Sequence, residues 1–200
     1  MSAIYNLGSV ILQSSINALG SVYIAAQVGG RKLAELFYVP GIALGTSAAT
    51  FSSQNYGAGK HSRIAKGAKS GIFMYFCWWL VALAFVIFLA PAAVRLITGS
   101  SNPEVIANGA LYLRIGIPMI PPMAVLVILR NILQGMRRPG MPLFCSCLEL
   151  IGKVIFALWL VPAFGYLAVC ICEPVTWVIC CVVIAVAVFA IRGEFTDRHI

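Results

Sequence analysis

The chain has 200 residues, of which 61% are hydrophobic and 10% are charged, against about 25% charged residues in a soluble domain. An ordinary soluble enzyme is excluded, because so much apolar side chain would leave one large sticky patch in water, whereas a bilayer accommodates it. The net charge of +8 does not indicate a nucleic-acid partner, since the basic residues stand between apolar runs without interleaved aromatics.

Six mostly apolar stretches predict six transmembrane helices, because about 20 such residues as helix cross a hydrocarbon core of about 30 Å. They cover residues 3–26, 33–53, 72–97, 105–133, 142–161 and 167–191. The links between them are short and rich in Gly, Pro, Asn and Ser, and none could hold a soluble domain. The sequence therefore predicts a single all-α, polytopic membrane domain over residues 1–200.

Basic residues are distributed unevenly between the two sides that alternate crossings define. One side collects Lys60, Arg63, Lys66, Lys69, Arg137, Arg138, Arg192 and Arg198, and the other collects Arg31, Lys32 and the nearby Arg95. Cytoplasmic loops of membrane proteins carry the excess of Lys and Arg. We therefore expect a multi-pass protein of the plasma membrane with both termini in the cytoplasm.

The first predicted span carries two amides, Gln13 and Asn17, four residues apart and so on one helix face. Polar side chains at membrane depth are costly and face a cavity or another helix. Two interpretations stay open here: a stripe that lines a polar cavity, or hydrogen bonds that join neighbouring helices.

The fifth span carries Glu149 and Lys153, whose i, i+4 spacing favours an ion pair. Glu149 lies ten residues after Pro139, which is about 15 Å of helix and close to the bilayer midplane. A membrane carboxylate that gains and loses a proton is a candidate for coupling transport to a cation. The pair is therefore our candidate coupling site, with a static structural ion pair as the alternative.

Other polar and kinking residues are candidates for the lining of a cavity. Arg114 lies within the fourth span, and Glu173 lies near the start of the sixth. Pro118 and Pro121 predict a break near the middle of the fourth span, and Pro40 predicts one in the second. Broken helices line binding cavities in many transporters, although a structural membrane helix also tolerates proline.

Motifs for catalysis or metal binding are missing from the sequence. His61 and His199 have no acidic partner at ligand spacing, and the GAGK at residues 57–60 lacks the rest of a phosphate loop. The seven cysteines fall in apolar stretches with C-x-C and C-C spacings, which are typical of packing residues. We expect neither an enzyme nor a protein with a metal or cofactor.

The stretch IALGTSAATFSSQNYGAGKHSRIAKG, at residues 42–67, resembles the signature of the multidrug and toxic compound extrusion (MATE) transporters. The signature loop matches at Gln54, Asn55, Gly57, Ala58, Gly59 and Lys60. The segments SSINALGSVYIAAQ, ILRNILQGMRRPGMPLF and LELIGKVIFALWLVPAFGYLAVCICEPVTW are also similar to this family. The resemblance covers nearly the whole chain.

The resemblance implies a secondary transporter that exports amphipathic organic cations and drugs by antiport with protons or sodium. It also implies two six-helix lobes around a central cavity, of which this chain resembles the second. We therefore expect a partner lobe, either a missing first half or a second copy of the chain, and small organic cations as substrates in the bilayer. Two alternatives remain: a lipid-linked saccharide flippase of the same superfamily, or an inactive half-transporter that serves as a membrane scaffold.

Overall fold

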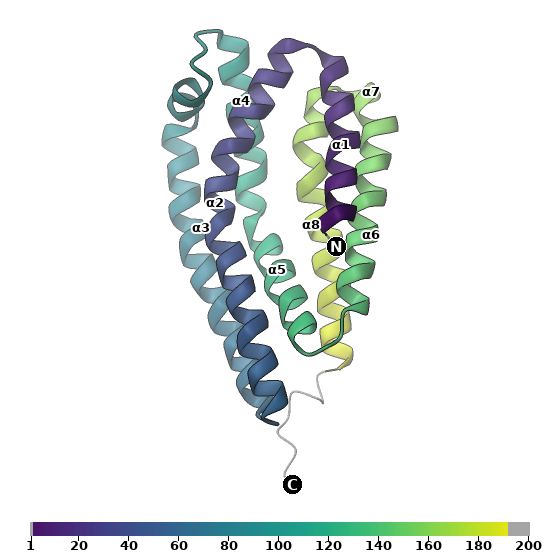
Figure 1. The fold of residues 1–200 in the computed structure, drawn as a ribbon. Helices are drawn as coiled ribbons and strands as arrows, with labels where there is room; N and C mark the ends of the chain where they lie inside the picture. The colour runs from purple at the N-terminus through teal and green to yellow at the C-terminus, as the bar shows by residue number, and fades with distance from the viewer. Residues whose placement is uncertain (1, 192–200) are drawn as a thin grey trace.

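The computed structural model describes the backbone of residues 2–191 and the side chains of residues 6–191, which form a bundle of long, roughly aligned helices (Figure 1). The α-helices are α1 (Ser2–Leu19), α2 (Ser21–Gly57), α3 (His61–Thr98), α4 (Pro103–Gly116), α5 (Ile120–Gly135), α6 (Gly140–Ile155), α7 (Val161–Phe164) and α8 (Tyr166–Ala190). A 3-10 turn, η1 (Ile117–Met119), joins α4 to α5, and a π-helical segment, η2 (Phe156–Leu160), joins α6 to α7.

Four continuous helical stretches are long and apolar enough to cross a bilayer: His61–Thr98, Pro103–Gly135, Gly140–Phe164 and Tyr166–Ala190. The expectation of six membrane spans is thus supported for four of them. The other two helices, α1 and α2, are present but more polar, with amides and hydroxyls in α1 and charges and glycines in α2. Helices of this composition are better covered by neighbouring protein than by lipid.

The boundary between the first two helices differs from the expected one. The chain breaks at Gly20, whose φ of 110° is open to glycine alone, and α2 begins at Ser21. Residues 21–32, expected as the end of the first span and a loop, therefore lie in α2, and Arg31 forms an i, i+4 ion pair with Glu35. The i, i+4 spacing of these two opposite charges in the sequence is a signal that favours a continuous helix at this position.

The expected break in the fourth span is confirmed at η1. Pro121 has no N–H to donate to the carbonyl of Ile117, the acceptor one helical turn earlier. Trp79 of α3 donates its indole N–H to this carbonyl at 3.0 Å, and Ile120 donates in the 3-10 pattern. A side chain from the neighbouring helix α3 therefore satisfies the carbonyl that the proline leaves without its usual donor. Membrane proteins tolerate proline within helices in this way.

Replacing Trp79 with phenylalanine should remove this hydrogen bond and retain most of the ring packing. We expect a loss of about 1 kcal/mol of stability and a melting temperature lower by about 2–4 °C. Trp159→Phe is the matched control, because Trp159 is 70% exposed and should tolerate the change. Equal melting temperatures of the two purified variants in detergent would show that the hydrogen bond contributes nothing.

Helix α2 runs without interruption through Pro40, so the structure has no helix break there of the kind at η1. Its glycines instead permit close packing: a Cβ at Gly41 would overlap the ring of Tyr75 in α3. Tyr75 is fully buried. Close approach at small residues is the usual way membrane helices associate, and it holds α2 against α3 here.

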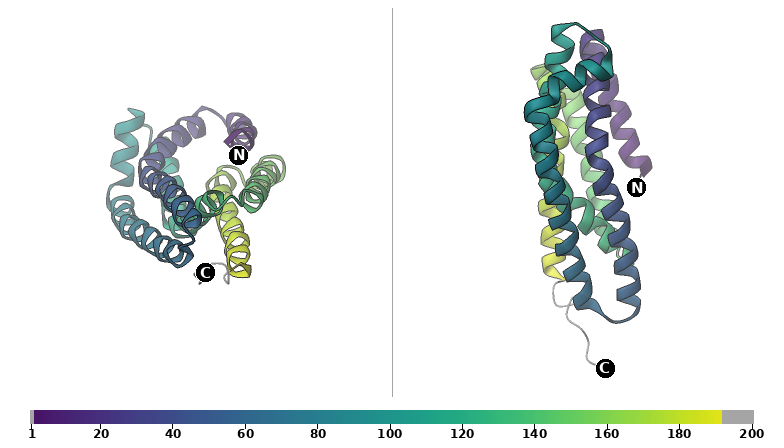
Figure 2. Two further views of the ribbon diagram at one scale, coloured as in Figure 1. Left: turned by 60° about the horizontal axis from the view of Figure 1, so that its bottom comes forward. Right: turned by 90° about the vertical axis from the view of Figure 1, so that its left-hand side faces the viewer.

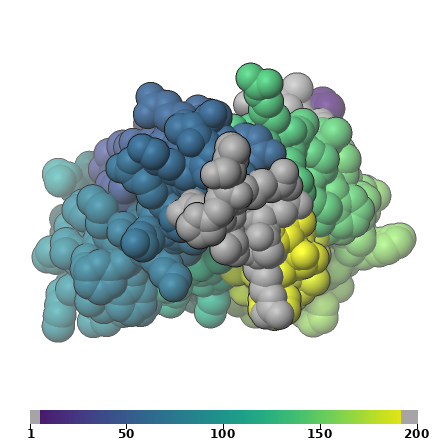
Figure 3. Space-filling view, turned by 90° about the horizontal axis from the view of Figure 1, so that it is seen from below, coloured from purple at the N-terminus to yellow at the C-terminus, as the bar shows by residue number. Residues whose placement is uncertain are grey.

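The long helices of the bundle fall into two groups, and this grouping positions the candidate site described below. Helices α2 and α3 stand together on one side, and α6 and α8 stand on the other, with α5 between them (Figure 2). When the bundle is viewed from the end at which α2 turns into α3, the two groups of helices occupy opposite halves of the visible surface (Figure 3). The basic residues Lys60, Arg63, Arg137 and Arg138 belong to the turns and helix ends at this end, as the prediction of a basic side requires.

Candidate functional site

A cavity of about 510 Å³ lies between α2 on one side and α5, α6 and α8 on the other. Its lining comprises Arg31, Glu35, Tyr38, Val39, Ile42, Met123, Leu126, Val127, Arg130, Glu149 and Trp177. Ligand sites have this character: mostly apolar walls and a few polar groups that fix orientation. Two basic and two acidic side chains give the lining no formal net charge.

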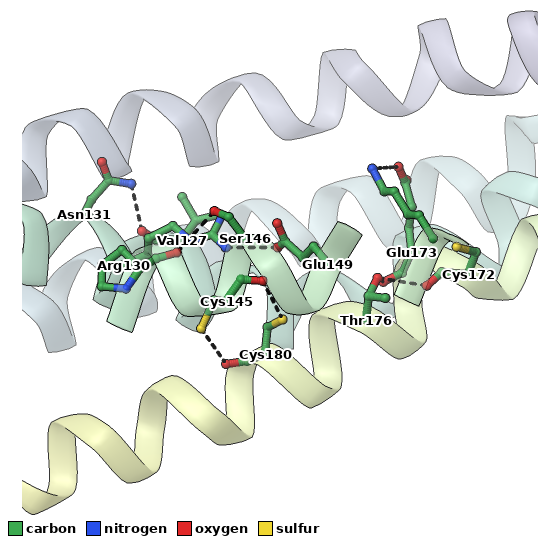
Figure 4. Close-up of polar contacts among 12 residues, drawn as sticks. Val127, Arg130, Asn131, Cys145, Ser146, Glu149, Cys172, Glu173, Thr176 and Cys180 are labelled. Carbon is green, nitrogen blue, oxygen red and sulfur yellow. Dashed lines mark hydrogen bonds and ion pairs between the residues drawn. The ribbon is translucent and has the colours of Figure 1, made fainter. Parts of the chain in front are cut away.

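An ion pair between Arg130 and Glu149 belongs to the lining of this cavity, and its contacts are drawn in Figure 4. Nη2 of Arg130 lies 3.2 Å from Oε1 of Glu149, and the two side chains are only 18% and 6% exposed. Among the described residues, Oε2 of Glu149 and Nε of Arg130 have no hydrogen-bond partner. Buried polar atoms are nearly always satisfied, so two unsatisfied atoms beside a cavity indicate a place for a ligand, an ion or water.

Aromatic rings line the same cavity as this ion pair. Tyr38 of α2 and Trp177 of α8 meet edge to face, with ring centroids 5.6 Å apart and an interplanar angle of 88°. Both residues line the cavity. Aromatic faces attract organic cations, particularly where water is excluded. A cavity that holds a carboxylate with an unsatisfied oxygen and two aromatic rings is therefore suited to an aromatic or alkylated cation.

A second charged cluster lies away from the cavity, at the junction of α1, α4, α6 and α8. Lys153 is 2% exposed, and its ammonium donates to Oγ of Ser9 at 3.0 Å. The ammonium also lies 4.0 Å from Oε1 of Glu173, whose Oε2 accepts a hydrogen bond from Tyr112 at 3.2 Å. The cluster thus joins four helices by charged and polar groups.

The ion pairing of Glu149 and Lys153 differs from the expected i, i+4 pair. Glu149 pairs with Arg130 of α5, and Lys153 pairs with Glu173 of α8. The physical reason is that each side chain finds an opposite charge on a facing helix. The structure therefore divides the single predicted site into a cavity site and a buried cluster.

The remaining predicted residues lie outside the lining of this cavity. Gln13 donates to Asn17 at 3.0 Å on α1, so the two amides share a face, as predicted from their spacing. Arg114 is exposed on α4. Pro40, Pro118 and Pro121 are partly buried and shape α2 and η1. Their role toward a cavity between lobes stays a prediction.

The signature loop builds the turn between α2 and α3. Asn55 is 7% exposed and donates to the carbonyl of Phe51 at 2.7 Å, while its own carbonyl accepts from the N–H of Lys60 at 2.9 Å. Gly59 has a φ of 69°, which favours glycine. Gln54, Gly57 and Ala58 complete the turn, with Ala58 donating to the carbonyl of Gln54. The motif thus has a structural role in this lobe.

Several residues of the cavity are not among the predicted site residues. The sequence predicts a loop at Arg31 and contact with lipid headgroups for Arg130, and it gives no signal for Tyr38 or Trp177. The i, i+4 spacing of Arg31 and Glu35 could have placed both on α2. Nothing in the sequence could have placed Tyr38 beside Trp177, far along the chain, because that contact depends on how α2 and α8 are each positioned against α5.

The sequence profile of the family described as MatE matches residues 1–159. Comparison with curated proteins gives no match.

Among solved structures, an outward-facing multidrug resistance transporter of the MATE family and MOP superfamily has a TM-score of 0.72 at 16% identity, covering 100% of this chain and 44% of that one. A MATE protein in complex with MaD3S has a TM-score of 0.70 at 18% identity, covering 99% and 45%. A MOP superfamily transporter from Pyrococcus furiosus, described as having a binding pocket of reverse polarity, has a TM-score of 0.68 at 17% identity, covering 100% and 44%.

The chain spans less than half the length of these structures, so its size is that of one lobe. The identities are low and establish the fold, whereas the profile match over most of the chain establishes the family. The chain belongs to the MatE family of membrane transporters.

Proposed function

We propose that this chain is one lobe of a secondary transporter that exports amphipathic organic cations in exchange for protons or sodium. The cavity between α2 and α8 would form this lobe's share of the substrate site. The observation that carries the proposal is the cavity wall itself: Glu149, 5% exposed with Oε2 unsatisfied, beside the rings of Tyr38 and Trp177.

The carboxylate of Glu149 can bind two kinds of cation, one after the other. A proton or a small cation on Oε2 neutralises the carboxylate in one state, and an organic cation takes its place in the other. Competition of this kind couples two fluxes in opposite directions, provided that the cavity faces each side of the membrane alternately. Arg130 holds the other oxygen at 3.2 Å and so fixes the direction in which Oε2 points.

Alternate exposure requires a second body against which this lobe moves. A partner lobe, from the same polypeptide or a second copy of the chain, would close the cavity on the side of α1 and α2. These two helices are the more polar ones, which suits a face toward protein and water rather than lipid.

The test is transport into proteoliposomes that contain the assembled transporter with this lobe. With an imposed pH gradient or sodium gradient, we expect accumulation of tetraphenylphosphonium, an aromatic organic cation, and collapse of that accumulation when an ionophore dissipates the gradient. Accumulation that is identical with and without both gradients would refute cation-coupled export.

A flippase for lipid-linked saccharides is the second candidate, and one observation favours it. Nε of Arg130 is a donor without a hydrogen-bond partner in the described structure, and it could bind an anionic phosphate. Arg114 and Lys153, the other basic residues within the predicted spans, serve this role poorly, since Arg114 lies outside the cavity lining and Lys153 is buried in its own cluster. In the same vesicles, a flippase would move a fluorescent pyrophosphate lipid between leaflets and accumulate no more tetraphenylphosphonium than vesicles without protein.

A further inference from the structure

Lys153 places an ammonium where a membrane protein rarely tolerates one. Its side chain is 2% exposed and comes from α6 into the junction with α1, α4 and α8. A buried charge is costly unless opposite charge and hydrogen bonds surround it. The surroundings of this ammonium therefore show what kind of ligand the junction is built to hold.

Among the described residues, oxygen atoms from α1 and α8 lie close to this ammonium. Oγ of Ser9 accepts from the ammonium at 3.0 Å, and Oε1 of Glu173 lies 4.0 Å away. Tyr112 donates to Oε2 of the same carboxylate at 3.2 Å and so fixes its orientation. A carboxylate with a hydroxyl beside it is the donor set of a hard cation, which takes oxygen ligands.

Helix α1 packs closely against the stem of Lys153 at Gly8. A Cβ at Gly8 would lie 3.0 Å from Cδ and 3.4 Å from Cβ of Lys153, so the absence of a side chain at Gly8 accommodates the lysine stem. The stem lies against α1, and we take the space that it occupies as the path to the position of the ammonium between Ser9 and Glu173.

We propose that Ser9 and Glu173, oriented by Tyr112, form a monovalent-cation site that the ammonium of Lys153 occupies as a covalently tethered cation. Dissolved sodium has no place there while the lysine is present. Removing the lysine side chain opens both the path and the site, and the carboxylate of Glu173 then takes up sodium from solution. In the proposed antiporter, the unaltered lobe would need no sodium at this cluster, because the ammonium of Lys153 supplies the positive charge.

The test compares the thermal stability of the purified full chain in sodium chloride and in choline chloride at equal ionic strength. We expect the melting temperature of the unaltered protein to be the same in both salts. For Lys153→Ala, a sodium Kd of about 10 mM would raise the melting temperature by about 3–6 °C at about 150 mM sodium. Transport is not needed for this readout, so its result is independent of whether the proposed function holds.

Two further variants serve as controls. Lys153→Met removes the charge but keeps the stem, so it should show no difference between the salts. The double variant Lys153→Ala/Glu173→Gln has the opened path without the carboxylate, and it should also lose the sodium effect.

Three results would overturn the proposal. One is an unaltered protein that sodium stabilises as much as it stabilises Lys153→Ala. Another is a folded Lys153→Ala with equal melting temperatures in both salts. The third is a Lys153→Ala that folds in neither salt while the double variant folds, because sodium would then have failed to compensate the carboxylate.

Discussion

Replacing Glu149 with glutamine should reduce gradient-driven export of an aromatic cation by the assembled transporter at least about tenfold, a loss of about 1.4 kcal/mol in the transport step. The amide has nearly the same shape, so the fold should persist. It carries no charge, however, and can neither attract an organic cation nor exchange it for a proton at Oε2. The measurement is the initial rate of tetraphenylphosphonium uptake at several external pH values.

Glu35→Gln is the matched control for this change. Glu35 also lines the cavity and pairs with a basic residue, but its side chain is 60% exposed. Charge pairs of that exposure contribute little, and export should stay within about twofold of normal. If Glu149→Gln retained both the rate and its pH dependence, the role of Glu149 as the coupling carboxylate would be refuted.

Replacing Gly135 with alanine should destabilise the lobe, although the change adds only one methyl group. A Cβ at this position would overlap the carbonyl oxygen of Ala49 and lie 3.2 Å from its carbonyl carbon. These atoms belong to the backbone of α2, so no side-chain rotation relieves the contact and α2 must move away from α5. We expect a loss of about 1–3 kcal/mol, measured as thermal stability in detergent.

Gly140→Ala provides the comparison, because a Cβ there has no neighbour within 4 Å. Alanine at the start of α6 should leave the melting temperature unchanged or raise it slightly. If the two variants melted at the same temperature, the crossing of α2 and α5 would not depend on the close approach at Gly135.

Local chemistry made part of the fold predictable. Pro118 and Pro121 predicted the break in the fourth span, because each removes a backbone N–H from its helix. The same argument was wrong for Pro40, where α2 continues without a break. The shared face of Gln13 and Asn17 followed from helical spacing, and the two amides are joined there by a hydrogen bond that had not been predicted. The identity of the group that stabilises the break, Trp79, depends on how α3 packs and could not be predicted.

Long-range pairing made the charged sites hard to predict. The spacing of Glu149 and Lys153 permits a pair within one helix, but Arg130 and Glu173 on the facing helices compete for them. Which pair forms depends on the rotation of α5 and α8 about their axes, and no single helix encodes that rotation. The π-helical segment at Phe156–Leu160 was missed for a similar reason, since Ser15 of α1 donates to its Ala157 carbonyl at 3.1 Å.

Equilibrium binding of radiolabelled tetraphenylphosphonium to the purified chain tests the central claim most directly, because it asks whether the cavity with Glu149 and Trp177 accepts an organic cation. We predict saturable binding with one site per chain, competition by protons as the pH falls, and binding at least about tenfold weaker in Glu149→Gln. Binding of equal strength in the unaltered protein and in Glu149→Gln, at every pH, would contradict the account.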